Sequence, residues 1–457
     1  MQKYNLTIIG SGPGGYVSAL FAAQLGMKVC LIEKGELGGV CLNCGCIPTK
    51  TLVSSAKALS LIKDAEKFGV KVGKPVLDFA SVTTRTKSVV DKLKKGIEFL
   101  LKSRKVDVKQ GLSAVIVDEH HIKIGKEDIE TENILIATGS SPVDIPAAKI
   151  DGKSILSSEG VLKIDSIPGE LVIIGGGVIG CEFATIFNKF GSRVTIIEMM
   201  EHLIPGGDEE LSKKLAAGLK KIGINVLTAC KVEGTRYDKG GRIILNTSTG
   251  SELSCDKVLV SVGRRPNVSG FGLENIGVEV TKSGIKVDEN MRTNLAGVYA
   301  IGDCVGGYML AHVASHEGLV ACKNIAGKKE KMDYSAVPSC TFTDPEIATC
   351  GMDEKVAKKN GLDVKVSRFY FRSLGKAHAI GKTDGFVKLV SLKTSGKIVG
   401  ASIMGESASD LIAEVALAIR NGLSSSDVVS TIHAHPTMAE AILEAAHISE
   451  GKPLHFL

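Results

Sequence analysis

The sequence lacks tryptophan and has few other aromatic residues. Only 4% of its 457 residues are aromatic, which leaves few side chains on which bases could stack. A dense block of lysine and arginine is also missing, since 56 basic and 50 acidic residues give a net charge of only +6. We therefore expect no nucleic-acid partner.

Long hydrophobic runs and a leader segment are missing as well. No stretch of about 18 apolar residues occurs, so we expect no membrane association. The first apolar strand begins near Tyr4, which leaves too little room for a targeting segment. The eleven cysteines are odd in number and mostly irregularly spaced, unlike a secreted disulfide framework. These features predict a protein of a reducing compartment, the cytoplasm.

Glycine, by contrast, is plentiful and marks a repeated pattern. Residues 4–33 and 170–198 both read as an apolar strand, a glycine-rich turn, a helix, a second apolar strand and a glutamate. The first glycine and the glutamate are 23 positions apart in both copies, from Gly10 to Glu33 and from Gly175 to Glu198. At roughly 150 residues per domain the chain is too long for one core. The pattern predicts an α/β protein with two Rossmann-like domains.

Each copy has the glycine spacing of a dinucleotide-binding turn. The first glycine permits a tight turn, the second lets a pyrophosphate approach the backbone, and the third lets the helix pack on the strand. A lone pattern of this kind is weak evidence, but here a strand, a helix and a spaced acid accompany it twice. Two such turns predict two dinucleotides, usually FAD and a nicotinamide cofactor. The glycines are Gly10, Gly12 and Gly15 in the first copy and Gly175, Gly177 and Gly180 in the second.

The two glutamates indicate how the ribose groups are bound. Glu33 and Glu198 follow the second strand of each unit, where a carboxylate accepts hydrogen bonds from ribose hydroxyls. A carboxylate at Glu198 repels a 2′-phosphate, and no arginine follows it at 199–203. The second site is therefore expected to take NAD rather than NADP.

A cluster of three cysteines lies between the first unit and the next helix. Cys41, Cys44 and Cys46 occur within six positions, followed by Lys50. Zinc fits poorly, because no second ligand pair follows at a finger-like distance, and a chance group of core thiols is a further alternative. A redox disulfide between Cys41 and Cys46, about one distorted helical turn apart, is favoured. A helix N-terminus and Lys50 are expected to lower the thiol pKa values.

The segment CLNCGCIPTK resembles the CxNxGCxPxK signature of the pyridine nucleotide-disulfide oxidoreductases. The resemblance runs from Tyr4 nearly to the C-terminus, and the matching segments keep the family order. The further motifs are ATGS at 137–140, GRRPN at 263–267, YAIGDC at 299–304 and HAHPT at 433–437.

The resemblance implies roles for individual residues. Taken alone, Lys50 and Asp303 would equally be surface charges; within the family pattern Lys50 lies near the reactive part of the flavin and Asp303 contacts its ribitol chain. The FAD site is then expected to contain Gly10, Gly12, Gly15, Glu33, Lys50, Ala114, Thr138, Gly139, Ser140, Asp303, Met309, Ala311 and His312. The NAD site is expected to contain Gly175, Gly177, Gly180, Glu182, Glu198, Val232 and Gly263.

Local features favour one branch of the family. Val178 stands where glutathione-reductase-like members carry a tyrosine, and both cysteines of the redox pair are present. The chain thus resembles enzymes that oxidise a dihydrolipoyl group, borne by a transacylase or a glycine cleavage carrier protein, and pass the electrons to NAD. A reductase of another small disulfide, a quinone reductase and a non-catalytic FAD scaffold are the alternatives.

The dithiol chemistry needs a base, because a dithiol has a pKa well above neutrality. A histidine before a proline is usually structural, but in the family pattern His435 is the base and Glu440 orients it. Together with Cys41, Cys46 and Lys50 these residues form the predicted catalytic set, with no metal site. The resemblance also implies a homodimer in which His435 serves the other subunit's disulfide.

The resemblance implies a division of the chain into three domains. FAD would bind residues 1–147 together with 263–335, and NAD would bind 148–262. Residues 336–457, where strands near 367 and 386 precede a helix at 410–421, would form an α+β dimerisation domain.

Overall fold

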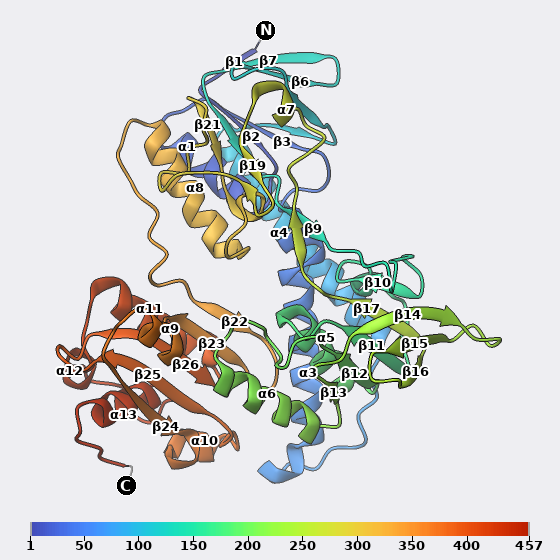
Figure 1. Ribbon diagram of the computed structural model, residues 1–457, viewed down its shortest axis with the longest axis vertical. Coiled ribbons are helices and arrows are strands. Elements are labelled where there is room, and N and C mark those ends of the chain that lie inside the picture. Colours follow the sequence, from blue (N-terminus) through green and yellow to red (C-terminus); the bar gives the residue numbers. More distant parts are fainter. Residues whose placement is uncertain (1, 456–457) are drawn as a thin grey trace. The chain divides into compact units, whose positions relative to one another are not determined.

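The computed structural model describes residues 2–455 of the chain, which form two compact units (Figure 1). The first unit contains the residues up to Ile167 and Val260–Met332. The second contains Pro168–Leu259 and Asp333–Leu457.

The first unit is built on a parallel sheet with the strand order β21-β8-β2-β3-β4. Its strands are β2 (Leu6–Ile9), β3 (Val29–Glu33), β4 (Asp107–Gln110), β8 (Ile134–Ile136) and β21 (Val298–Ala300). Every residue of β2 and β3 is buried. Such apolar runs are typical of a parallel sheet covered by helices on both faces.

Two helices of the first unit pack closely although they are far apart in sequence. Figure 1 shows α1 (Pro13–Gln24) beside α8 (Ala311–Ile325). A Cβ atom at Gly14 would lie 3.2 Å from the carbonyl oxygen of Ala314, and one at Gly318 would lie 2.1 Å from Ser18 Oγ. Glycine on both helices therefore allows this contact.

The remaining strands of the first unit form small sheets around the main one. A mixed sheet has the order β1-β7-β6-β5, and β9 pairs with β18. The strands are β1 (Gln2–Tyr4), β5 (Ala114–Ile116), β6 (His121–Ile124), β7 (Glu127–Thr131), β9 (Ser140–Pro142), β18 (Arg264–Pro266), β19 (Val280–Thr281) and β20 (Gly284–Ile285). The long helix α4 (Phe79–Ser103) also belongs to this unit.

The second unit begins with a further Rossmann-like element. Strands β17, β11, β12 and β13 are adjacent in that order, and α5 (Val178–Phe190) joins β11 to β12. The antiparallel strands β14, β15 and β16 follow. The bounds are β11 (Glu170–Ile174), β12 (Arg193–Ile197), α6 (Glu209–Lys221), β13 (Asn225–Leu227), β14 (Val232–Tyr237), β15 (Ile243–Thr247), β16 (Glu252–Cys255) and β17 (Lys257–Val260).

The C-terminal part of the second unit is an antiparallel sheet with the order β22-β23-β26-β25-β24. Side chains of β25 contribute to two hydrophobic cores. Val387 and Leu389 pack with α11 and α13, whereas Val390 packs with α9. The bounds are β22 (Ser339–Thr341), β23 (Ile347–Gly351), α9 (Glu354–Lys359), β24 (Val364–Tyr370), β25 (Phe386–Leu392), β26 (Ile398–Met404), α11 (Ala408–Asn421), α12 (Ser425–Ser430) and α13 (Glu440–Ser449).

This architecture confirms the predicted fold class of two Rossmann-like elements and a C-terminal α+β part. The boundaries of the three domains stay a prediction.

Over residues 2–455, no helix is both long and apolar enough to cross a membrane. The same part of the chain contains no group of three or more histidine, cysteine or acidic side chains placed to hold a metal ion.

Candidate active site

The first glycine turn is built from backbone contacts that leave no room for side chains. Gly10 has a φ of +101°, and a Cβ atom there would lie 2.3 Å from the carbonyl oxygen of Ala137. A Cβ atom at Gly15 would lie 1.8 Å from the carbonyl oxygen of Gly10. At Gly12, however, nothing lies within 4 Å of the same position. This open side at the N-terminus of α1 fits a pyrophosphate.

The second glycine turn repeats this geometry. Gly175 has a φ of +105°, and its N–H donates to Ile197 O at 2.8 Å, as the N–H of Gly10 donates to Ile32 O at 2.8 Å. A Cβ atom added at Gly177 would also have nothing within 4 Å, and Gly180 is buried in α5. Both turns therefore fit a dinucleotide, as the sequence predicts.

The two acidic residues tie each turn to its second strand. Glu33 accepts the N–H of Ser11 at 2.8 Å and the N–H of Gly35 at 2.7 Å, one with each carboxylate oxygen. Glu198 accepts the N–H of Gly176 at 2.7 Å and that of Met200 at 2.8 Å in the same way. Oε2 of Glu33 also accepts the hydroxyl of Ser11 at 2.7 Å, so Glu33 keeps a free lone pair on Oε1, whereas Glu198 keeps one on each oxygen. Both carboxylates can therefore accept a ribose hydroxyl as well.

A break between two helices brings Cys41 and Cys46 together. Cys41 lies in α2 (Gly39–Cys44), and Cys46 is the first residue of α3 (Cys46–Lys63). At Gly45, between them, a Cβ atom would lie 2.9 Å from Val40 O and 3.3 Å from the Cα of Cys41. Glycine thus lets the chain fold back, and the Cys41 and Cys46 side chains are hydrogen-bonded to each other.

The start of α2 is fastened to the first glycine turn. The N–H of Gly38 donates to Ser11 O at 3.1 Å. A Cβ atom at Gly39, whose φ is +60°, would lie 2.6 Å from the Cα of Gly12. The amide of Asn43 then ties the start of α2 to the preceding chain by donating to Leu37 O, before the helix, and to Gly39 O, within it, each at 2.9 Å. The cysteine pair and the first dinucleotide turn are thus parts of one backbone assembly.

The pKa values of two of the three neighbouring thiols, Cys41 and Cys44, are raised. The hydrogen bond with Cys46 and burial raise the pKa of Cys41, although Lys50 acts in the opposite direction. Burial, aided by the charge of Glu159, raises the pKa of Cys44 to about 11. The expected lowering of the pKa is therefore wrong for Cys41 in this dithiol state, because the hydrogen bond with Cys46 and the partial burial of the Cys41 sulfur both favour the neutral thiol.

Two motifs predicted to bind FAD are cross-linked by hydrogen bonds. Arg264 donates from Nε to Ser140 Oγ at 2.7 Å and from Nη2 to Ser140 O at 2.8 Å. The hydroxyl of Ser140 in turn donates to Asp303. Thr138 donates to Asn267 O at 2.7 Å, and the N–H of Asn267 donates to Gly139 O at 2.9 Å. The structure thus places Thr138, Gly139, Ser140 and Asp303 in one network.

Two buried residues outside the predicted set hold the Asp303 loop in place. Glu317 of α8, only 3% exposed, accepts the N–H of Gly302 at 2.7 Å. The thiol of Cys304 is fully buried and donates to Ile301 O at 3.1 Å. Its burial raises the pKa of Cys304 to about 11. In the sequence, the only sign of this role is that Glu317 stands among apolar residues of a helix. Matching of family motifs does not identify such a residue.

The other predicted cofactor residues lie on several elements. In the first unit, Lys50 belongs to α3, Ala114 is buried in β5, Met309 precedes α8 with a φ of +48°, and Ala311 and His312 begin α8. In the second unit, Glu182 accepts the N–H of Phe342 at 3.0 Å, and Val232 begins β14. Gly263 belongs to the first unit, where its φ is +122°.

His435 and Glu440 form a hydrogen-bonded pair in the second unit. Nδ1 of His435 lies 2.8 Å from Oε1 of Glu440, the first residue of α13. The other carboxylate oxygen accepts the N–H of Thr437 at 2.8 Å. Burial alone would raise the pKa of Glu440, but the hydrogen bonds from His435 and Thr437 lower it overall. The ionised carboxylate keeps the proton on Nδ1, so Nε2 of this 77% exposed ring can accept another.

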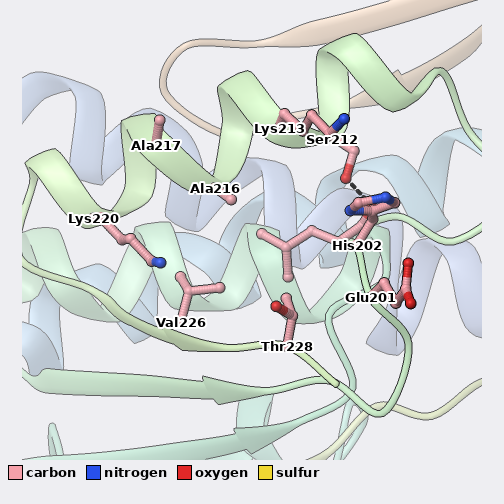
Figure 2. A pocket seen from close by; sticks show the side chains of 10 residues that line it. Glu201, His202, Ser212, Lys213, Ala216, Ala217, Lys220, Val226 and Thr228 are labelled. Atoms are coloured by element: carbon pink, nitrogen blue, oxygen red, sulfur yellow. Dashed lines mark hydrogen bonds between the residues drawn. The ribbon is translucent and has the colours of Figure 1, made fainter. Parts of the chain in front are cut away.

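A cavity of about 260 Å³ lies next to the second glycine turn but contributes no redox group (Figure 2). Leu203 lines it, and a Cβ atom at Gly176 would lie 2.5 Å from the same leucine. Its polar groups are engaged locally: Ser212 donates to Leu203 O at 2.5 Å, and Lys213 pairs with Glu209 at 2.6 Å. The cavity therefore adds no group to the predicted catalytic set.

Comparison with known proteins identifies the family of the whole chain. Residues 4–318 match the model of the pyridine nucleotide-disulphide oxidoreductases, and residues 337–446 match the dimerisation domain of the same family. A dihydrolipoyl dehydrogenase of Geobacillus stearothermophilus is 43% identical, over 98% of this chain and 97% of its own. A dihydrolipoyl dehydrogenase of Bacillus subtilis (strain 168) is 41% identical, over 98% of this chain and 97% of its own.

Solved structures agree with this assignment. LpdA from Mycobacterium tuberculosis superposes with a TM-score of 0.92 at 26% identity, covering 98% of this chain and 99% of that one. The HOCl-induced flavoprotein disulfide reductase RclA from Escherichia coli gives a TM-score of 0.88 at 28% identity, covering 97% and 100%.

Proposed function

The chain belongs to the pyridine nucleotide-disulphide oxidoreductase family, and from this premise we propose that it is a dihydrolipoyl dehydrogenase. It oxidises the dihydrolipoyl group of a partner protein through the Cys41–Cys46 disulfide, with FAD and NAD as cofactors. The observation that carries the proposal is the hydrogen-bonded Cys41–Cys46 pair, fastened through Gly39 to the first dinucleotide turn. Relatives of this name that match over nearly the full chain support the choice of substrate.

In the proposed mechanism His435 is the base. Its Nε2 takes a proton from the dithiol, and Glu440 stabilises the resulting imidazolium. The substrate thiolate attacks the sulfur of Cys41 in the oxidised pair, and Cys46 leaves as a thiolate. The second substrate thiol, after losing its proton, displaces Cys41 and closes the cyclic disulfide, so two electrons remain on the protein pair.

The cofactors would be held by this chain's two turns. Gly10, Gly12, Gly15 and Glu33 would bind FAD, with Asp303 positioned by Ser140 and Arg264. The second turn and Glu198 would bind NAD. Bound FAD supplies two-electron transfer from the reduced cysteine pair to NAD. The protein's part is to place the two substrates at separate sites, so that they need not meet.

The assembly that we propose is a homodimer, in which His435 of one protomer serves the cysteine pair of its partner. The match of residues 337–446 to a dimerisation domain supports the proposed homodimer.

The lipoyl group would be carried by a transacylase component or a glycine cleavage carrier protein. We further propose that the enzyme acts in the cytoplasm, whose reducing environment suits a chain with eleven mostly irregularly spaced cysteines.

Anaerobic titration of the purified holoenzyme with dihydrolipoamide tests the function. We expect a long-wavelength absorption band, since a thiolate at Cys46 beside oxidised flavin gives charge-transfer absorption. Flavin that responds to NADH but not to dihydrolipoamide would contradict the proposal and favour a reductase of another disulfide or of quinones.

A further inference from the structure

A second histidine–carboxylate pair adjoins the first. Nδ1 of His455 lies 2.7 Å from Oε1 of Glu444, and the N–H of His455 donates to the other oxygen at 3.3 Å. The side chain of Glu444 is only 7% exposed, whereas that of His455 is 73% exposed. The C-terminal segment is thus fixed at His455 by both backbone and side chain.

The two carboxylates are neighbours on one helix. Glu440 and Glu444 lie four positions apart in α13, which puts their side chains on the same face about one turn apart. His435 and His455 each direct Nδ1 to one of them. The charge of His455 also acts directly on Glu440, where it favours the ionised carboxylate.

Charged groups on the elements packed against α13 are engaged elsewhere. The groups that face His455 are Glu444 and Glu440, both from α13. The neighbouring charges have their own partners: Lys365 of β24 with Glu450, Lys388 of β25 with Asp208, and Asp427 of α12 with Ser424.

We propose that His455 is a positioning residue that places a positive charge beside Glu440 and so sets the pH range in which His435 accepts a proton. The inference rests on the proposed role of His435 as the base. It adds a residue that does not touch the substrate and acts through Glu440.

The direction of the effect follows from the charges. The hydrogen bond to Glu444 raises the pKa of His455, so its ring carries a positive charge further toward neutral pH. A positive charge close to Glu440 weakens the pull of that carboxylate on a second positive charge at His435. Protonated His455 therefore disfavours a second positive charge at His435 and helps the base to release its proton.

Hydrogen–deuterium exchange at the imidazole carbon, read by mass spectrometry, measures the pKa of each histidine in the holoenzyme. We expect His455→Gln to raise the pKa of His435 by about 0.5, the size of one screened surface interaction. His455→Lys, which restores a positive charge, should return it to the wild-type value or below. The matched control is His121→Gln, because His121 is also a partly exposed ring on a carboxylate, 2.9 Å from Asp118, but lies in the first unit, away from α13 in sequence.

The pH profile of kcat/KM for dihydrolipoamide should move upward by the same amount in His455→Gln, while NADH-to-dye transfer is unchanged. A pKa of His435 that is the same in wild type, His455→Gln and His455→Lys would overturn the inference. The pKa of His435 could respond to the His455 variants as expected while the protein fails to oxidise dihydrolipoamide. That result would support the effect of His455 on His435 and overturn the proposed function instead.

Discussion

A Cβ atom at Gly39 would lie 2.6 Å from the Cα of Gly12. The helix that carries Cys41 and the turn expected to carry a pyrophosphate therefore touch through backbone alone. Because two glycines make this contact, no flexible side chain sets the separation of the cysteine pair from the first nucleotide turn.

Gly39→Ala should release FAD. The new methyl group meets backbone that cannot move aside, and a φ of +60° adds roughly 1 kcal/mol of strain. We expect at least a tenfold weaker retention of flavin, measured as the flavin-to-protein ratio after dialysis. Gly69→Ala is the control, since Gly69 has a φ of +77° but nothing within 4 Å of its Cβ position. If both variants lost flavin equally, backbone strain rather than the contact between Gly39 and Gly12 would explain the loss.

The three neighbouring cysteines should separate by function. Cys41→Ser and Cys46→Ser should abolish dihydrolipoamide oxidation and still bind FAD, because neither sulfur belongs to the glycine turn. Cys44→Ser should keep most of the activity, since burial holds the pKa of Cys44 near 11 and the thiol stays protonated at neutral pH. Steady-state rates and visible spectra would test this; an inactive Cys44→Ser enzyme with normal flavin content would give Cys44 an essential part.

His435→Gln should slow the dithiol half-reaction by about 100-fold or more, the usual contribution of a general base. NADH-to-dye transfer does not need this base and should be nearly unchanged. Stopped-flow measurement of each half-reaction distinguishes them. An equal loss in both half-reactions would count against the role as base.

Glu33 and Glu198 offer a paired test of the two nucleotide sites. Each is buried and accepts one backbone N–H from its own glycine turn and one from the residue two positions after it. Glu33→Ala should lower the flavin content, whereas Glu198→Ala should raise the KM for NADH about tenfold, as expected for a loss near 1.4 kcal/mol, and leave the flavin bound. Flavin loss in Glu198→Ala would contradict the assignment of the second turn to NAD.

A buried ion pair joins α6 to the C-terminal sheet and should dominate local stability. Lys388 pairs with Asp208, and both side chains are at most 5% exposed. Lys388→Met leaves a buried carboxylate without its cation, a loss of roughly 3–5 kcal/mol. Lys393→Met breaks an exposed pair with Asp363 and should cost under about 1 kcal/mol. The midpoints of thermal unfolding would compare the two.

The same pair predicts a pH dependence of the stability. Burial raises the pKa of Asp208, but hydrogen bonds from Lys388 and Ser402 lower it overall below the ordinary 3.8. The ionised form is thus favoured by folding, so this stabilisation is present above about pH 4 and is lost as the pH falls further. The stability difference between wild type and Asp208→Asn should shrink over that range; a constant difference would contradict it.

The sequence by itself determined the parts of this protein that depend on local geometry. The glycine turns and the Cys41–Cys46 pair each lie within a short segment, where spacing favours one local geometry, whereas the pairing of His435 with Glu440 was predicted from the family resemblance. The tertiary structure decided the rest. Arg264 reaches Ser140 and Lys388 reaches Asp208 across 124 and about 180 positions, and Glu317 fixes the Gly302 N–H from a separate helix. Such contacts follow from strand order and helix packing, which no local spacing encodes. The pKa of Cys44 is likewise set mainly by burial, and burial exists only once the chain has folded.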